Sequence, residues 1–242
     1  MQKNSAPDIF GFAFKDYIAG KKDGKISVHT ELTGFTELDE LPVAYFFRDF
    51  PSMPEWEQLA LAHCRGLVLD VGAGAGAHAL ELQSRGMDVY AIDISPGAVM
   101  IMQERGVKQA FCSDIMKVSG MKFNTILFLM NGIGMAKDLN GLKELLLHAA
   151  GLLVPGGVIL LESTDIIYMF KEEDGSILIP LGEKYFGEII YRLSYNAYEG
   201  EPFPWLFVDF DNLQGIAGEC GFSTEILYRG ENHNYLAALQ IS

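Results

Sequence analysis

The sequence predicts an α/β fold in which a mostly parallel β-sheet is covered by helices on both faces. Two observations lead to this prediction. Short apolar stretches alternate with helix-like stretches from residue 66 onwards, as they do in strand–helix–strand units. The first apolar stretch, residues 68–71, runs directly into three glycines and the start of a helix. The 242 residues are 49% hydrophobic, so the chain can bury the core that such a sheet requires.

The N-terminal region, residues 1–65, precedes the first expected core strand. Residues 10–17 are rich in aromatic side chains and are expected to form a short helix. Residues 55–64 follow Pro54 and place apolar side chains on one side, so we expect a second helix there. Between the two helices, residues 25–50 show no regular pattern and are expected to be irregular.

Five parallel strands and three helices are expected in the core. The strands cover approximately residues 67–71, 88–93, 109–113, 124–130 and 157–163. The helices cover approximately residues 76–85, 96–105 and 139–151. Because the carboxyl ends of parallel strands meet at one edge of a sheet, polar residues at those ends are expected to share one binding site.

The pattern changes after Asp165. Residues 188–198 alternate between apolar and polar side chains, which predicts a strand with one face in water. Aromatic side chains are frequent in the neighbouring segments. We interpret residues 168–207 as an insertion near the mouth of the active site.

The chain closes with a helix and a hairpin. The helix is expected at residues 209–219 and ends before Gly221. Residues 223–229 and 234–241 then form two apolar-rich stretches separated by a short polar turn. This arrangement predicts an antiparallel β-hairpin at the C-terminus.

The charge balance argues against a nucleic-acid partner. The chain has 32 acidic and 18 basic residues, which gives a formal net charge of −14 at pH 7. Binding a phosphate backbone requires a basic patch, and so few basic residues leave little room for one. A small molecule is therefore the favoured partner, and a protein is the less favoured alternative. Nothing in the composition predicts the oligomeric state.

The sequence also predicts neither a transmembrane helix nor a metal site. No apolar run approaches the 18 residues of a transmembrane helix. Residues 1–7 lack the charged and apolar regions of a signal peptide, which favours a cytoplasmic protein. Cys64, Cys112 and Cys220 lie far apart, and neither they nor the five histidines show a metal-ligand spacing. We expect free thiols and no metal site.

The glycine-rich turn at residues 72–76 predicts a nucleotide-type binding site. Gly72, Gly74 and Gly76 lie between an expected strand and an expected helix. Glycine lets the backbone approach a ligand without a Cβ in the way. The helix that follows offers unpaired N–H groups and the positive end of its dipole.

Two aspartates narrow the class of ligand. Asp70 precedes the first glycine by two residues, where a carboxylate would repel a pyrophosphate but suit an amino group. Asp93 ends the next expected strand, about 20 residues beyond the glycines, and is placed to bind ribose hydroxyls. S-adenosylmethionine (SAM) fits this pair better than NAD. The NAD alternative stays open, because Gly72, Gly74 and Ala77 also satisfy the dinucleotide pattern.

Across residues 66–165 the chain resembles the class I SAM-dependent methyltransferases. Five segments carry the resemblance in the family's order, at residues 68–76, 91–95, 112–115, 124–131 and 152–161, and the last contains the Leu-x-Pro-Gly-Gly turn. The resemblance implies a Rossmann-like, doubly wound sheet of seven strands with an antiparallel C-terminal hairpin. It also implies that residues 1–65 form a helical lid, that residues 66–242 form the SAM-binding domain, and that SAM is the cofactor.

The resemblance also assigns cofactor contacts to individual residues. The methionine part of SAM is expected at Asp70 and the glycine turn, the ribose at Asp93 and Ile94, and the adenine at Asp114 and Ile115. Arg48 is a further candidate, because a guanidinium binds a carboxylate with two hydrogen bonds. A solvated Arg48 is the alternative. The full set of expected cofactor contacts is Arg48, Asp70, Gly72, Ala73, Gly74, Gly76, Asp93, Ile94, Asp114, Ile115 and Asn131.

Methyl transfer places few demands on catalytic residues. The acceptor atom must lie about 3 Å from the methyl carbon and in line with it. A general base is needed only for a hydroxyl or a protonated amine. Asn131, after the fourth expected core strand, could orient an acceptor or accept from the SAM amino group, or could simply form a turn before Gly132. His29 is a candidate base, and a surface or capping histidine is its alternative.

The favoured hypothesis is therefore a SAM-dependent methyltransferase that acts on a small molecule. A SAM-binding protein without transferase activity, an NAD(P)-dependent oxidoreductase and an aminopropyl transferase that uses decarboxylated SAM are the alternatives. The acceptor contacts are expected in residues 1–50 and 165–207, where the resemblance is weakest.

Overall fold

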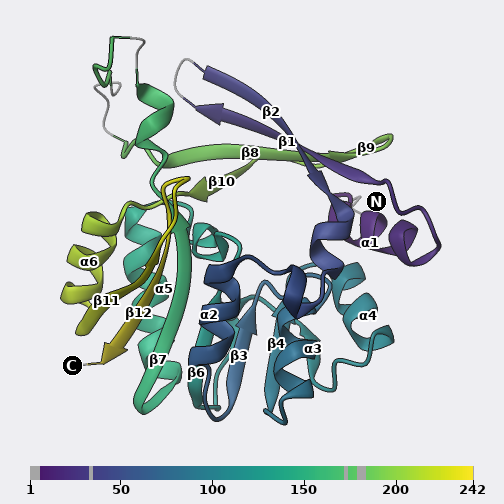
Figure 1. Cartoon of the computed structure of the whole chain (residues 1–242), viewed down its shortest axis with the longest axis horizontal. Coiled ribbons are helices and arrows are strands. Elements are labelled where there is room, and N and C mark those ends of the chain that lie inside the picture. The colour runs from purple at the N-terminus through teal and green to yellow at the C-terminus, as the bar shows by residue number, and fades with distance from the viewer. Residues whose placement is uncertain (1–5, 33–34, 172–173, 179–183, 242) are drawn as a thin grey trace, which may run out of the picture.

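The computed structural model describes residues 6–32, 35–171, 174–178 and 184–241, which form two β-sheets lying one above the other (Figure 1). The predicted insertion at 168–207 therefore falls partly outside the described residues. The larger sheet has the order β11 (Phe222–Arg229), β12 (Asn234–Ile241), β7 (Leu153–Thr164), β6 (Phe123–Phe128), β3 (Val68–Val71), β4 (Val89–Asp93) and β5 (Ala110–Cys112). Strands β7, β6, β3, β4 and β5 are parallel, whereas β12 and β11 are antiparallel. The predicted fold class is confirmed.

Helices cover both faces of the larger sheet. On one face, α2 (Glu55–His63), α3 (Ala77–Ser84) and α4 (Pro96–Glu104) bury Leu61, Leu82 and Met102 in one cluster with side chains of β3, β4, β6 and β7. On the other face, α5 (Leu139–Leu152) and α6 (Phe210–Glu219) pack on the opposite side chains of the same strands. Strands that are buried on both faces explain the nearly continuous apolar runs in the sequence.

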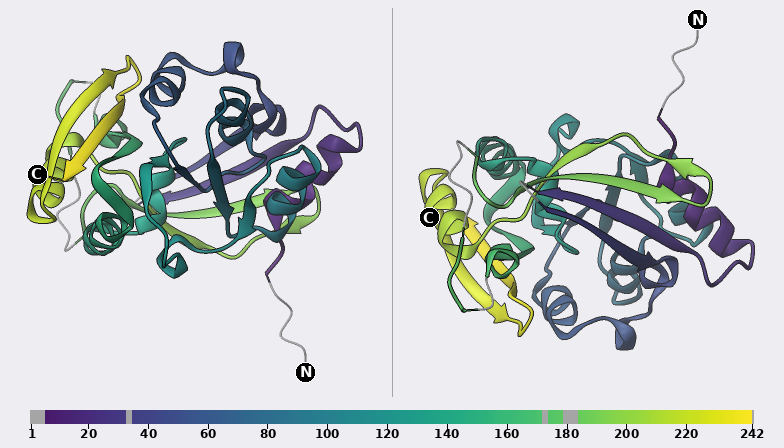
Figure 2. Two further views of the ribbon diagram at one scale, coloured as in Figure 1. Left: turned by 90° about the horizontal axis from the view of Figure 1, so that it is seen from below. Right: turned by 90° about the horizontal axis from the view of Figure 1, so that it is seen from above.

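The smaller sheet has the order β10 (Phe203–Leu206), β8 (Glu188–Tyr195), β1 (Lys25–Leu32) and β2 (Phe35–Pro42), and β9 (Tyr198–Glu199) pairs with β8. Seen from above, it crosses the carboxyl edge of the larger sheet (Figure 2). The strand predicted within residues 188–198 is β8. Because β8 pairs with β1, the N-terminal segment and the segment after β7 build one sheet together.

Two features of the N-terminal segment differ from the sequence prediction. Residues 25–42, which were expected to be irregular, form the β1–β2 hairpin. Two short 3₁₀ turns follow, η1 (Val43–Phe47) and η2 (Phe50–Ser52). The hairpin was missed because its burial depends on β8, which lies far along the chain. The predicted helix at 10–17 is present as α1 (Ile9–Ile18).

A third apolar cluster joins the two layers. Phe14 of α1 and Ile26 of β1 are fully buried, and they pack in one cluster with Ala75 of the glycine turn and Ala98 of α4. The smaller sheet and α1 are therefore fixed to the core directly beside the glycine turn. Among the described residues, no helix has the length and apolar character needed to cross a membrane.

Candidate functional site

The glycine turn adopts the backbone conformation that its sequence demands. Gly72, Gly74 and Gly76 have φ angles of +70°, +56° and +80°, in the left-handed region that L side chains rarely adopt. Gly76 is the N-cap of α3. A Cβ at Gly76 would also lie 2.8 Å from a methyl carbon of Val107. The turn therefore brings backbone N–H groups and a helix N-terminus to the carboxyl edge of the sheet.

Asp93 fixes this turn from the neighbouring strand. Its Oδ2 accepts a hydrogen bond from the N–H of Gly74 at 2.9 Å, and its Oδ1 accepts one from the N–H of Ser95 at 2.8 Å. Burial raises the pKa of Asp93, whereas these two hydrogen bonds lower it, and burial prevails. The sequence predicted that Asp93 and the glycine turn share a site, and the structure brings them into direct contact.

Ile94, Asp114 and Ile115 extend the same edge beyond β4 and β5. The Ile94 side chain is 77% exposed, so it offers an apolar surface next to Asp93. Asp114 is exposed, and its Oδ1 caps the turn η3 (Ile115–Lys117) by accepting from the N–H of Met116 at 2.9 Å. Ile115 is buried. The three residues lie at the ends of adjacent strands, as the sequence predicted.

The chain turns sharply after β6. Met130 and Asn131 have φ angles of 56° and 55°, and such a conformation costs roughly 1–3 kcal/mol for each residue other than glycine. The N–H of Met130 donates to Glu162 Oε2 at 2.7 Å, and Thr164 donates to Asn131 Oδ1 at 3.0 Å. Side chains of β7 therefore hold this strained turn. Asn131 forms the turn before Gly132 and also lies at the expected reaction centre.

A buried cluster of charged side chains lies between the glycine turn and α2. Glu57 is fully buried and accepts hydrogen bonds from the Arg48 guanidinium through both oxygens. His78 Nε2 lies 2.7 Å from Glu57 Oε2. Burial favours neutral forms of Glu57 and His78, but their mutual contact prevails, so the pKa of Glu57 is lowered and that of His78 is raised. The cluster links the segment after η1 to α3.

Two further carboxyl groups lie near enough to sense the charge of His78, but neither forms an ion pair within the described part of the chain. Asp70 is 2% exposed, and burial raises its pKa to about 6. Its Oδ2 is buried and has no hydrogen-bond partner among the described residues. Burial and the charge of Glu57 raise the pKa of Glu162 to about 7. Asp70 Oδ2 is therefore free to accept a hydrogen bond from a cationic group, which is the kind of ligand group predicted beside Asp70.

Arg48 is buried among protein partners and is not solvated. Its side chain is buried rather than solvated, and it pairs with Glu57 and with the carbonyl oxygen of Tyr45. The guanidinium also lies 3.7 Å from the centre of the Tyr45 ring. Its Nε is buried and has no partner within the described part of the chain. A contact between Arg48 and a cofactor carboxylate stays a prediction.

His29 lies on the face of β1 that points away from the core. Ile26 packs towards the core, and side chains alternate along β1, so Val28 and Thr30 share its face whereas His29 points away from the core. The nearest polar group is Ser194 Oγ, 3.5 Å from His29 Nε2. This placement favours the alternative of a surface histidine, and the role of His29 as a base stays a prediction.

Aromatic side chains of the N-terminal segment cover the glycine turn. A Cβ at Gly74 would lie 3.5 Å from the Phe46 ring and 3.9 Å from the Phe14 ring. The ring centres of Phe14 and Phe46 are 5.1 Å apart. Neither phenylalanine was singled out from the sequence. The aromatic richness of residues 10–17 was the only available signal.

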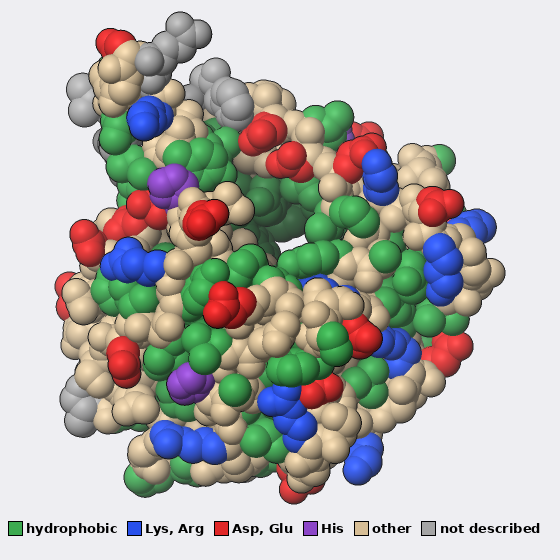
Figure 3. All heavy atoms as spheres, viewed as in Figure 1, with side chains coloured by type: hydrophobic (Ala, Val, Ile, Leu, Met, Phe, Trp, Pro, Cys, Tyr) green, Lys and Arg blue, Asp and Glu red, His purple; other side chains and the backbone are tan. Residues whose placement is uncertain are grey.

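A hollow lies between the two sheets, and the space-filling view shows it as an opening lined largely by hydrophobic side chains (Figure 3). The smaller sheet lies above this hollow. Its register places three aromatic side chains on the face towards the core, those of Tyr191, Phe203 and Trp205. Trp205 packs against Gly134, where a Cβ would lie 2.2 Å from the indole nitrogen. Burial and the nearby carboxylates of Asp39 and Glu37 raise the pKa of Tyr191. The hollow is aromatic and has acidic groups at its margin.

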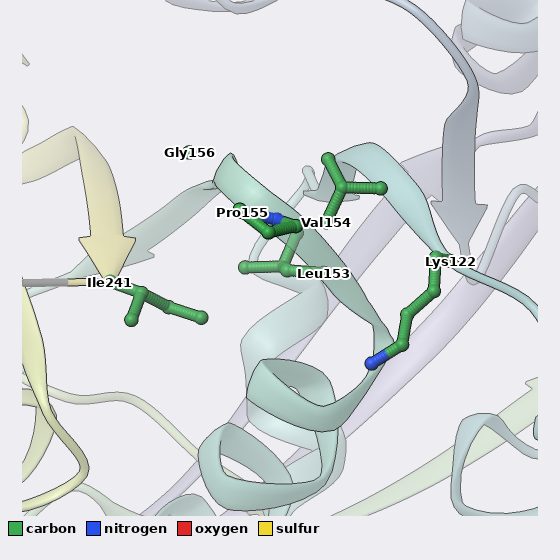
Figure 4. A pocket seen from close by; sticks show the side chains of 6 residues that line it. All are labelled: Lys122, Leu153, Val154, Pro155, Gly156 and Ile241. Atoms are coloured by element: carbon green, nitrogen blue, oxygen red, sulfur yellow. The ribbon is translucent and has the colours of Figure 1, made fainter.

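A second depression lies at the opposite edge of the larger sheet (Figure 4). Its lining consists of Lys122, Leu153, Val154, Pro155, Gly156 and Ile241. The Lys122 ammonium donates to the carbonyl oxygen of Gly151, and the other side chains are apolar. The described residues also contain no group of three or more His, Cys, Asp or Glu side chains able to hold a metal ion. The glycine turn and the hollow above it therefore form the candidate site.

The chain is similar to known methyltransferases in sequence and in fold. A family model described as a methyltransferase domain matches residues 68–157. A SAM-dependent methyltransferase from Bacteroides fragilis, crystallised with S-adenosyl-L-homocysteine, is 39% identical, with a TM-score of 0.89 and 98% coverage of each chain. The methyltransferase CcbJ from Streptomyces caelestis is 14% identical, with a TM-score of 0.59, and covers 80% of this chain and 94% of its own.

A third solved structure extends the likeness of fold. The PH0226 protein from Pyrococcus horikoshii is 20% identical, with a TM-score of 0.59, and covers 77% of this chain and 88% of its own. At these identities the second and third structures establish the fold alone. A search of curated proteins finds no match.

Replacing Glu57 tests the buried charge cluster. Glu57→Ala leaves the buried Arg48 and His78 without their shared carboxylate, which is expected to lower the free energy of unfolding by about 3–5 kcal/mol. Urea unfolding measures the change. Glu81→Ala is the matched control, because it removes a partly exposed pair with Arg85 worth about 0.3–0.5 kcal/mol. Equal losses of unfolding free energy in the two variants would contradict the buried pairing of Glu57 with Arg48 and His78.

Proposed function

The chain belongs to the class I SAM-dependent methyltransferases, and from that premise we propose that it methylates a small-molecule acceptor held between the two sheets. SAM is the cofactor of the family, which decides between SAM and NAD. The observation that carries the proposal is the aromatic hollow directly above the glycine turn and the end of β6. A small organic molecule fits such a partly enclosed, mostly apolar space.

The residues around the glycine turn suit SAM. The left-handed glycines open the backbone to a ligand, and the unpartnered Oδ2 of Asp70 offers an acceptor for an ammonium group. We assign the methionine part to Asp70, Gly72, Ala73, Gly74 and Gly76. We assign the ribose and adenine to Asp93, Ile94, Asp114 and Ile115. The buried Nε of Arg48 supports a role at the cofactor carboxylate, although its other nitrogens are held by Glu57 and Tyr45.

The protein's contribution to the reaction is positioning and exclusion of water. When bound, SAM supplies a methyl group activated by its sulfonium, and the reaction is an in-line displacement. Correct alignment of the acceptor can be worth roughly 7–11 kcal/mol. Asn131 is held by Thr164 at the strained turn after β6 and is proposed to orient the acceptor. Phe14, Phe46 and Trp205 shield the two sides of the site from water.

Electrostatics support a small molecule over a nucleic acid. The chain carries a net charge of −14, and the named groups at the margin of the hollow, Glu37 and Asp39, are acidic. A polyanion would be repelled at this entrance. An uncharged or cationic acceptor would not.

Substitution of Asp93 tests the cofactor site. Asp93→Asn keeps the side-chain shape but loses the charge and one acceptor oxygen, so we expect the Kd for S-adenosylhomocysteine to rise by about 100-fold, equivalent to roughly 2.7 kcal/mol. Calorimetric titration measures this value. Asp88→Asn is the matched control, because Asp88 is exposed at the opposite end of the same strand. A Kd within twofold of the wild-type value in Asp93→Asn would defeat the assignment.

Substitution of Trp205 tests the acceptor site. The assay measures S-adenosylhomocysteine formed from SAM in the presence of pooled small amines, phenols, thiols and hydroxy compounds, with pooled protein and RNA in parallel. We expect turnover with a small molecule, and we expect Trp205→Ala to lower kcat/KM at least tenfold while S-adenosylhomocysteine binding persists. Tyr198→Ala is the control, because Tyr198 is exposed and stacks on Phe12. Turnover with protein or RNA alone would refute the proposal.

A further inference from the structure

Asp8 lies where two helices begin, and its carboxylate joins them. Oδ1 accepts hydrogen bonds from the N–H of Gly11 at 2.9 Å and from Ser95 Oγ at 2.6 Å. Oδ2 accepts one from the N–H of Gly97 at 2.8 Å. Asp8 is thus the N-cap of α1 and also contacts the first turn of α4, where the positive ends of both helix dipoles favour a negative charge.

The two helices touch through their backbones at this point. A Cβ at Gly97 would lie 2.4 Å from the Cα of Gly11, and a Cβ at Gly11 would lie 2.9 Å from the Cα of Gly97. Neither glycine has a positive φ angle. Their small size is therefore required by the contact between α1 and α4 and not by the local backbone conformation.

A continuous series of hydrogen bonds leads from Asp8 to the glycine turn. Asp8 accepts from the Ser95 hydroxyl, the N–H of Ser95 donates to Asp93, and Asp93 accepts from the N–H of Gly74. The carboxylate assigned to the ribose is consequently held by the same serine that holds Asp8. A displacement of Asp8 would remove one of the groups that orient Ser95.

Helix α1 contributes to the other side of the site as well. Phe10 and Phe14, both on α1, have ring centres 5.4 Å and 5.1 Å from that of Phe46. Phe14 and Phe46 are the rings nearest to Gly74. The position of α1 on α4 therefore sets where the aromatic cover lies above the glycine turn.

We propose that Asp8 is a positioning residue for cofactor binding. By docking α1 on α4 it fixes the Asp93 carboxylate through Ser95 and the aromatic cover through Phe14. Asp8 does not touch the cofactor and acts only through these neighbours. By linkage, a bound cofactor favours the docked position of α1 to the same extent that docking favours the cofactor. The proposal rests on the SAM site assigned above.

The first test compares two helix-capping aspartates. Asp8→Ala is expected to raise the Kd for S-adenosylhomocysteine at least tenfold in a calorimetric titration at a temperature where the variant is folded. Asp209→Ala is the matched control, because Asp209 caps α6 through the N–H of Asn212 at 3.0 Å, on the far side of the molecule from α1 (Figure 1). Both variants lose a cap and some stability in urea unfolding. Only Asp8→Ala should weaken binding.

A second variant displaces α1 without removing any functional group. Gly97→Ala inserts a methyl group at the backbone contact, whereas alanine by itself favours the helix. We expect its Kd for S-adenosylhomocysteine to rise several-fold, and this test stands even where Asp8→Ala does not fold. If the wild-type protein binds S-adenosylhomocysteine and both variants have a Kd within twofold of the wild-type value, the proposed role of Asp8 is overturned. Absence of wild-type binding would instead refute the cofactor site itself.

Discussion

The left-handed backbone at Gly72, Gly74 and Gly76 is the constraint around which the rest of the site is arranged. Only glycine occupies such positions without strain, and no side chain then separates the turn from a ligand. Asp93 satisfies the N–H of Gly74, and α3 begins at Gly76. The smaller sheet and α1 are placed so that aromatic rings face the same turn. The proposed cofactor contacts and the covering elements therefore meet at one backbone segment, residues 72–76.

The covering elements are fastened to the core on both sides of this turn. On one side, Asp8 docks α1 on α4. On the other side, Arg48 and Glu57 tie the segment after η1 to α2 and, through His78, to α3. Buried ion pairs are poor sources of net stability, but breaking one is costly, so they specify position well. Such contacts fix α1 and the segment after η1, whose positions determine the shape of the space above the glycine turn.

The sequence predicted those parts of the fold that depend on local patterns. The larger sheet and its helices followed from alternating apolar segments, and the glycine turn with Asp93 followed from a motif whose geometry is local. The β1–β2 hairpin was missed because β1 is stabilised by β8, about 160 residues away. The same pairing decides that His29 faces outward. The partners of Arg48 and Asp8 are likewise set by tertiary contacts that no spacing in the sequence encodes.

The most direct test of the SAM site is the thermal stabilisation of the wild-type protein by S-adenosylhomocysteine, with NAD measured in parallel. A ligand at 100 times its Kd adds about 2.7 kcal/mol to the free energy of unfolding, and for a chain of this size that raises Tm by roughly 5–10 °C. We expect this shift with S-adenosylhomocysteine and none with NAD. A shift with NAD and none with S-adenosylhomocysteine would contradict the assignment of the glycine turn and Asp70 to SAM.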